Sequence, residues 1–266
     1  MSFAPGIALV EAWDVCTANS ETSPFPGCVT HNLLPTISCM EQHGAFRART
    51  IDDDARLLEQ SYRLRYQVYC VERRFIDAAA YPNQQEVDEF DAESVHLGVV
   101  DSRGELAATA RLIKANPRGF PMFRHCAFFP EVQTLDSPQA VPLEVSRVAI
   151  SREYARHRAH GSTRNRFEPF LTLVKAMVQG GRRAGATHLM GATDAALHRW
   201  LVHFGLPYRI SGPAVDYYGP VAPCIMSLRE LDEIIVSGRF PALERIGVGW
   251  DPRRWPEHHE AGLLSC

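Results

Sequence analysis

The sequence contains no run of eighteen consecutive apolar residues, and no two of its seven cysteines form a C-x-x-C pair. The first absence predicts that no helix spans a membrane. The second, with the odd number of cysteines, argues against a disulfide framework and a zinc site. The N-terminal apolar stretch also lacks a preceding Lys or Arg, so it does not resemble a secretory signal. Reduced cysteines in a cytoplasmic protein fit these features best.

A strong excess of charge of either sign is absent too, because the 266 residues have a formal net charge of −3. This excludes a generally basic nucleic-acid-binding protein, although a local basic tract is present. Eleven histidines are available, but His157, His160 and the His258–His259 pair lack a third ligand at useful spacing. We therefore expect no metal and no bound cofactor.

The chain divides by pattern into three parts. Residues 1–50 have no clear period and are interpreted as an irregular N-terminal extension. Residues 51–230 alternate helical and strand patterns, and residues 231–266 are expected to form a C-terminal helix and tail. The elements expected between these limits are a helix at 55–75, a hairpin at 96–113, a strand at 141–150, a helix at 167–185, a strand at 188–193, a helix at 195–204 and strands at 207–211 and 221–228. This order predicts an α/β fold with a mixed central sheet flanked by helices.

Four short patterns in this part combine charged and aromatic residues. Arg65 is followed by aromatic residues four and ten positions later, and an R-L pair lies within the predicted hairpin. The full set is Arg65 with Tyr69 and Phe75, then Asp88 with Asp91, then Arg111 with Leu112, and last Glu144 with Arg147. Each pattern alone is common, but all four in this order are specific.

Together they resemble the acyl-homoserine-lactone synthases, the long-chain N-acyl amino acid synthases and, still more closely, the acyltransferases associated with exosortase systems. The resemblance covers about residues 55–230 and implies a GNAT-like acyltransferase fold. Tyr69 and Phe75 stand where the homoserine-lactone family usually has Phe and Trp, and the N-terminal extension is foreign to its short members. These departures favour an amino acid acceptor over S-adenosylmethionine.

The three arginines and the nearby acids allow two interpretations. Arginine presents a planar set of donors suited to carboxylates and is not buried without a partner. The charges therefore either join helix, loop and sheet as a structural network or line a pocket for the amine and carboxylate of an amino acid. The predicted substrate-binding residues are Arg65, Tyr69, Phe75, Asp88, Asp91, Arg111, Arg147, Val148 and Ala149.

Aminolysis of a thioester requires a neutral amine, so a carboxylate or a water chain must accept a proton. Glu86 and Glu144 are the candidate catalytic residues, with a purely structural role left open for Glu144. The fold implied by the resemblance supplies backbone N–H groups for the developing oxyanion after Arg147, which points to Val148 and Ala149.

The acyl donor is suggested by an absence and a basic tract. GNAT enzymes that use coenzyme A usually follow this strand with R-x-x-G-x-G/A, whose N–H groups bind pyrophosphate; residues 151–161 lack that pattern. Residues 147–183 instead hold nine Lys or Arg against two acids. We expect acyl carrier protein, an acidic partner, to dock here and to present its acyl-phosphopantetheine thioester as co-substrate. The docking residues are Arg152, Arg156, Arg158, Arg164, Arg166 and Lys175, although a solvated charged surface explains them equally simply.

The prediction is thus an N-acyltransferase that moves a fatty acyl group from acyl carrier protein to an amino acid α-amine. Two alternatives stay open: an acyl-homoserine-lactone synthase and a non-catalytic lipid-binding relative. Peripheral membrane association through the lipid product also stays open. A long acyl chain requires an apolar tunnel, although core packing is the more common role of apolar residues. Those available for a tunnel are Met122, Phe123, Phe128, Phe129, Leu173, Met177, Leu189 and Met190.

Overall fold

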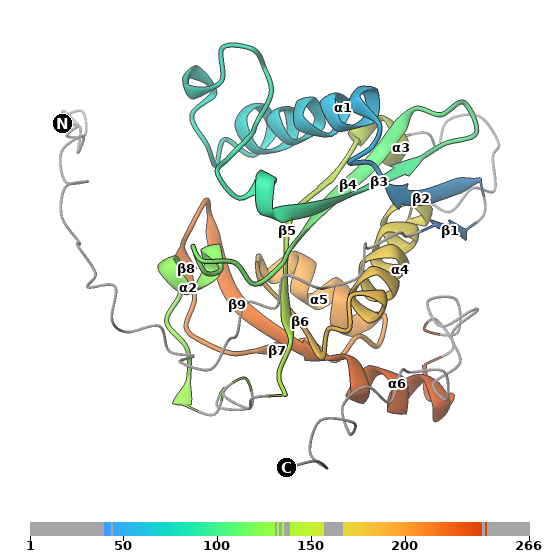
Figure 1. Cartoon of the computed structure of the whole chain (residues 1–266), viewed down its shortest axis with the longest axis vertical. Coiled ribbons are helices and arrows are strands. Elements are labelled where there is room, and N and C mark those ends of the chain that lie inside the picture. Colours follow the sequence, from blue (N-terminus) through green and yellow to red (C-terminus); the bar gives the residue numbers. More distant parts are fainter. Residues whose placement is uncertain are drawn as a thin grey trace, which may run out of the picture.

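A large mixed sheet organises the chain in the computed structural model (Figure 1). The structure describes residues 40–43, 45–130, 132, 135, 139–156, 167–240 and 243. The strands are β1 (Met40–His43), β2 (Phe46–Thr50), β3 (Ser94–Val100), β4 (Leu106–Ile113), β5 (Pro142–Ile150), β6 (His188–Thr193), β7 (Arg209–Ile210), β8 (Val215–Asp216) and β9 (Pro220–Ser227). The helices are α1 (Ala55–Tyr66), α2 (Pro121–His125), α3 (Arg152–Arg156), α4 (Glu168–Arg183), α5 (Ala195–His203) and α6 (Leu228–Val236).

The strand order is β1-β2-β3-β4-β5-β6-β9-β7, with β8 paired to β9. Among these strands the neighbours are antiparallel, except that β5 runs parallel to β6. The predicted hairpin, the strand at 188–193 and the helix at 195–204 are present with small shifts in their ends. The predicted α/β class with a mixed sheet flanked by helices is confirmed.

The sheet begins earlier in the chain than the sequence interpretation placed it. The sequence predicts irregular structure up to residue 50, but Phe46–Thr50 forms β2 and pairs with β3, with Ala48 opposite Val99. Phe46 and Ala48 are buried while Arg47 is exposed. This alternation of apolar and charged residues is the strand signal present in the sequence.

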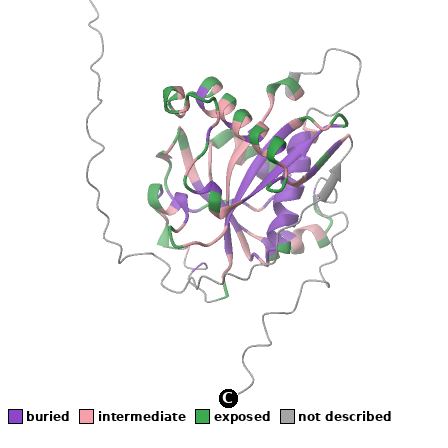
Figure 2. Cartoon of the chain, turned by 45° about the horizontal axis from the view of Figure 1, so that its top comes forward, coloured by how far each residue is buried: buried purple, intermediate pink, exposed green. Residues whose placement is uncertain are grey.

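Helices α4 and α1 pack against alternate side chains of the same strands. Leu97, Val99 and Leu112 belong to the core cluster that includes α4. His96 of β3, one position out of phase, instead contacts Tyr62 of α1 edge to face at 5.7 Å. Successive side chains of a strand point to opposite faces, so α1 and α4 lie on opposite faces. Figure 2 shows buried residues concentrated in the strands and α4.

The first helix changes its winding before it reaches the predicted end at residue 75. Asp54 caps its N-terminus by accepting from the Leu57 N–H at 3.1 Å. The α-helix ends at Tyr66 and continues as the π-helical segment η1 (Gln67–Glu72). Such wider turns are rare and concentrate at functional sites. Within η1, Tyr69 donates its hydroxyl hydrogen to the carbonyl oxygen of Val148 at 2.9 Å.

Candidate active site

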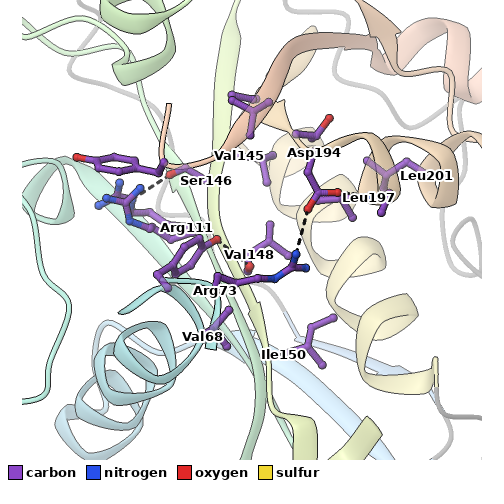
Figure 3. Close-up of a pocket in the computed structure, with 18 of the residues that line it drawn as sticks. Val68, Arg73, Arg111, Val145, Ser146, Val148, Ile150, Asp194, Leu197 and Leu201 are labelled. Atoms are coloured by element: carbon purple, nitrogen blue, oxygen red, sulfur yellow. Dashed lines mark hydrogen bonds and ion pairs between the residues drawn. The ribbon is translucent and has the colours of Figure 1, made fainter. Parts of the chain in front are cut away.

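A cavity of about 680 Å³ opens where β5 and β6 part. The two strands pair over three positions only, ending with Glu144 opposite Met190, and β5 continues to Ile150 without β6. Gly191 lies at the point of divergence, where a Cβ would meet the Val145 carbonyl oxygen at 2.6 Å. Figure 3 shows Val145, Val148 and Ile150 along β5, facing Leu197 and Leu201 of α5.

A bulge in β5 shapes the wall of this cavity. Thr109 of β4 lies opposite Ala149, whereas Arg111 lies opposite Ser146, so β5 carries one extra residue between them. Arg147 falls in the bulge and has a φ of 51°, a conformation that non-glycine residues rarely adopt. Bulges interrupt the ladder and redirect side chains, and this one turns Arg147 toward the acids beneath α1.

Arg65, Arg111 and Arg147 form one network with the acidic segment. Arg65 donates to Glu86 at 2.6 Å and to both oxygens of Asp91 at 2.7 and 3.1 Å. Arg111 donates to Asp91 at 2.8 Å and to both oxygens of Asp88 at 2.5 and 3.0 Å. Because Arg147 also binds Glu86 and Asp88, three guanidinium groups balance three carboxylates.

His96 extends this network to the surface. Its ring nitrogens lie 2.7 Å from Asp52 and 3.0 Å from Asp91. Burial opposes the charged ring, but the hydrogen bonds to Asp52 and Asp91 outweigh it and raise the pKa of His96. Burial likewise works against ionisation of Asp91, but bonds from His96 and Arg65 hold the Asp91 pKa well below its usual range. The sequence interpretation missed His96 and Asp52 because neither falls in the four motifs.

Glu144 lies in a different environment from the acids of the network. It lines the cavity, is 2% exposed, and accepts a hydrogen bond from the Met122 N–H at 3.1 Å. Burial raises the pKa of the Glu144 carboxyl to about 8, and the Met122 bond offsets this only in part. Glu86 is also buried, but both its oxygens accept from arginines and it does not line the cavity.

The predicted aromatic residues also line the cavity. Tyr69 and Phe75 both line the cavity, as do Tyr217 and Tyr218. The Phe75 ring lies against Gly219, which has a φ of 102° and where a Cβ would meet the ring at 2.6 Å. The turn after β8 therefore rests on Phe75.

Val148 and Ala149, the predicted oxyanion donors, follow Arg147, Val148 within the bulge and Ala149 where the pairing with β4 resumes. Val148 lines the cavity, and its carbonyl oxygen accepts from Tyr69. Ala149 is 1% exposed and lies opposite Thr109 in the ladder. The oxyanion role stays a prediction.

The predicted docking residues are only partly described. Arg152 is exposed and forms an ion pair with Glu72 at 2.7 Å. Lys175 does not lie on the surface as expected: it is 7% exposed within α4, whose residues 169–182 are all buried. A buried side chain cannot contact a docked protein, which removes Lys175 from the docking surface. The side chain of Arg156, and Arg158, Arg164 and Arg166, lie outside the described residues.

The apolar wall of the cavity differs from the predicted tunnel. Of the eight predicted tunnel residues, Met177 and Met190 line the cavity; Leu173 and Phe128 pack in the core clusters and do not line it. Sequence reasoning missed Arg73 and Asp194 at the opening. The apolar lining that it also missed consists mainly of Phe167, Phe170, Leu197, Trp200, Leu201 and Tyr208. Phe170 and Leu201 had the helical period of core residues, so no sequence signal separated the two roles.

No group of His, Cys, Asp and Glu among the described residues could hold a metal ion. Within the same part of the chain, no helix is long and apolar enough to cross a membrane.

Comparison with known proteins agrees with this architecture. Residues 64–163 match the family model described as an acetyltransferase (GNAT) domain. The structure of the acyl-homoserine-lactone synthase LasI is similar, with 19% identity and a TM-score of 0.50 over 72% of this chain and 91% of that one. The structure of MesI, a CoA-dependent acyl-homoserine lactone synthase, has 18% identity and a TM-score of 0.50 over 74% of this chain and 89% of that one. The structure of FeeM, an N-acyl amino acid synthase from uncultured soil microbes, has 14% identity and a TM-score of 0.47 over 70% of this chain and 91% of that one. No curated protein sequence matches the chain.

The chain therefore has the GNAT fold, and the predicted resemblance to the acyl-homoserine-lactone synthases is confirmed at the level of structure. The GNAT match and the shared fold support an acyltransferase.

Proposed function

We propose that the protein transfers an acyl group from a phosphopantetheine thioester to the α-amine of an amino acid, forming an N-acyl amino acid. The observation that carries this proposal is Glu144, a buried carboxyl with a pKa of about 8 at the polar end of a largely apolar cavity. Perturbed titratable groups in clefts are typical of catalytic sites. Diverging strands beside a bulge give the thioester room to enter.

Glu144 is the general base in this mechanism. An α-ammonium group has a pKa of about 8 at a chain terminus and a higher one in a free amino acid, so an ordinary carboxylate, which is at least about four pH units more acidic, accepts its proton poorly. A carboxyl whose pKa is raised to about 8 removes most of that mismatch. The ammonium proton goes to the Glu144 carboxylate, and the neutral amine then attacks the thioester carbon. As the C–S bond breaks, Glu144 gives that proton to the departing thiolate, which leaves as the free phosphopantetheine thiol. The Glu144 carboxylate takes the second proton from nitrogen and releases it to solvent.

The network beneath α1 positions the acceptor. Arg147 uses Nε and Nη2 for Glu86 and Asp88, and its Nη1 donates no hydrogen bond to another residue in the described ranges. Burial opposes charge on Arg147, but Glu86 and Asp88 raise its pKa, so the guanidinium stays charged. Nη1 is then suited to the acceptor carboxylate. Glu86 holds Arg65 and Arg147 in place, and Val148 N–H is assigned to the oxyanion.

Acyl carrier protein is our proposed donor, supported by the missing glycine-rich turn and the basic tract that begins near Arg152. Coenzyme A is the competing donor, since MesI is a CoA-dependent enzyme. Charge reversal at Arg156 and Arg158 should raise KM for acyl carrier protein and strengthen its salt dependence. Unchanged kinetics would leave coenzyme A as the donor.

The free thiols Cys70, Cys126 and Cys224 support a reducing, cytoplasmic location.

The decisive experiment offers the protein acyl thioesters of both carriers with the twenty amino acids and, separately, with S-adenosylmethionine. Mass spectrometry of the products distinguishes the alternatives. An N-acyl amino acid supports the proposal. A lactone with release of methylthioadenosine contradicts it, and acyl-chain binding without turnover identifies a non-catalytic relative.

A further inference from the structure

Arg73 lies at the opening of the cavity, directly after η1, and its charge is loosely matched. Its Nη1 lies 3.8 Å from Asp194 Oδ2, beyond hydrogen-bond distance, and its side chain is 53% exposed. The other three arginines that line the cavity have carboxylate contacts of 2.5 to 2.9 Å. Arg73 is therefore the lining arginine, among the described residues, that an incoming anion can recruit most easily.

Asp194 also caps a helix, so only one of its carboxylate oxygens is available to Arg73. Its Oδ1 accepts from the Leu197 N–H at 2.7 Å and caps the N-terminus of α5. Only Oδ2 faces Arg73. Exposed ion pairs at such distances contribute little to stability, so Arg73 can exchange this partner while the cap of α5 stays intact.

The position of Arg73 relative to the reacting groups suits an elongated donor. Figure 3 shows Arg73 extending across the cavity, near Val148 and Ile150, toward Asp194 on the other side. Glu144 lies on β5 as well, four residues before Val148, and the bulge at Arg147 lies between them. An anion at Arg73 would thus be separated from a carbon near Glu144 by a passage through the cavity, whose lining is mainly apolar.

Phe75 keeps the guanidinium in this place. The Arg73 Cζ lies 5.8 Å from the centre of the Phe75 ring, within the range of a cation–π contact. The ring in turn packs on Gly219. Arg73 is therefore oriented at the opening by a contact that leaves its N–H groups available.

We propose that Arg73 binds the phosphate of the phosphopantetheine arm that carries the acyl group, exchanging Asp194 for that phosphate. This inference rests on the proposed function. Arginine binds phosphate through paired charge-assisted hydrogen bonds, and the arm beyond the phosphate is an uncharged chain that suits the passage. The phosphate is common to acyl carrier protein and coenzyme A, so the inference holds for either donor.

The test compares donors that differ in the phosphate. Acyl-4′-phosphopantetheine, acyl-CoA and acyl carrier protein thioester carry it, and acyl-pantetheine does not. Arg73→Ala should raise KM about tenfold for the three phosphate-bearing donors, the loss of about one charge-assisted hydrogen bond. KM for acyl-pantetheine should stay within about twofold. Asp194→Asn, which keeps a capping side chain, should lower KM for the phosphate-bearing donors by freeing Arg73.

Arg74→Asn is the matched control. Arg74 is exposed, does not line the cavity, and has a φ of 55°, which Asn tolerates. It removes the neighbouring positive charge, so an effect equal to that of Arg73→Ala would indicate general attraction of anions and overturn the inference. An equal rise in KM for acyl-pantetheine would overturn it as well.

Failure of the proposed function is recognised separately. If the parent protein transfers no acyl group, calorimetry with 4′-phosphopantetheine and pantetheine as probes measures the phosphate contribution directly. Tighter binding of the phosphorylated probe that disappears in Arg73→Ala supports the inference without any turnover. Equal binding of both probes by the parent protein refutes it.

Discussion

Arg147 donates from Nε to both carboxylate oxygens of Glu86, at 3.0 and 3.1 Å, from the left-handed position that the β5 bulge creates. Arg65 occupies the same carboxylate from the other side at 2.6 Å. Glu86 thus joins α1 to β5, with both of its oxygens bound by guanidinium groups. These contacts with two cations distinguish Glu86 from Glu144, and they favour a positioning role for Glu86.

Glu86→Gln should therefore destabilise the fold. Removing one partner from a buried ion network leaves the others uncompensated and costs about 3–5 kcal/mol. Urea unfolding measures the change. Glu233→Gln is the control, because Glu233 pairs with Arg229 at 3.3 Å on an exposed surface of α6, where such pairs contribute less than about 1 kcal/mol. A Glu86 variant of parental stability with lost turnover would assign catalysis to Glu86 instead.

Glu144→Gln should have the opposite effect on stability in alkaline solution. The folded carboxyl has a pKa of about 8, against 4.5 for the ordinary group. Its contribution to stability is fully present below about pH 4.5 and is lost as the pH rises through about 8. Glutamine loses no proton, so the variant should exceed the parent at about pH 9, by roughly 5 kcal/mol at most. Chemical denaturation near pH 5 and pH 9 measures this difference in stability. If the difference between the variant and the parent is the same at both pH values, Glu144 is not held protonated.

The same substitution should reduce turnover. A general base contributes about a hundredfold or more to a rate, so kcat should fall by at least that factor. In the parent, kcat should rise with pH and level off above about 8, as the Glu144 carboxyl ionises. The variant should lack this rising limb. If the variant keeps this rising limb and a normal kcat, a water chain or another group accepts the proton instead of Glu144.

The sequence predicted much of the site because charge is costly to bury. Arg65 and Arg111, on an apolar helix stripe and in a hairpin strand, required buried partners, and the acids that follow residue 85 supply them. The predicted network is present, and Arg111 and Arg147 of this network also line the cavity. That the cavity binds an amino acid stays a prediction.

Other features depend on geometry that no local pattern encodes. The left-handed φ of Arg147 follows from a one-residue excess in β5 relative to β4. The cavity wall depends on where β5 leaves β6, so Phe170 faces a void although its helical period matches that of a core residue. The raised pKa of Glu144 comes from burial and not from a neighbouring sequence motif.

Gly219→Ala tests whether the turn after β8 depends on Phe75. The φ of 102° is unfavourable for Ala, and the new methyl group would lie 2.6 Å from the Phe75 ring. We expect a loss of stability of about 2 kcal/mol or more and a rise in KM, because Phe75 must move from the cavity wall. Gly185→Ala is the control, since Gly185 has a φ of 70° and a Cβ there would meet no atom within 4 Å, so it should show only the backbone cost of about 1 kcal/mol. Adding Phe75→Leu should restore part of the stability of the Gly219 variant but not its KM. Equal losses in the two glycine variants would show that the contact with Phe75 is unimportant.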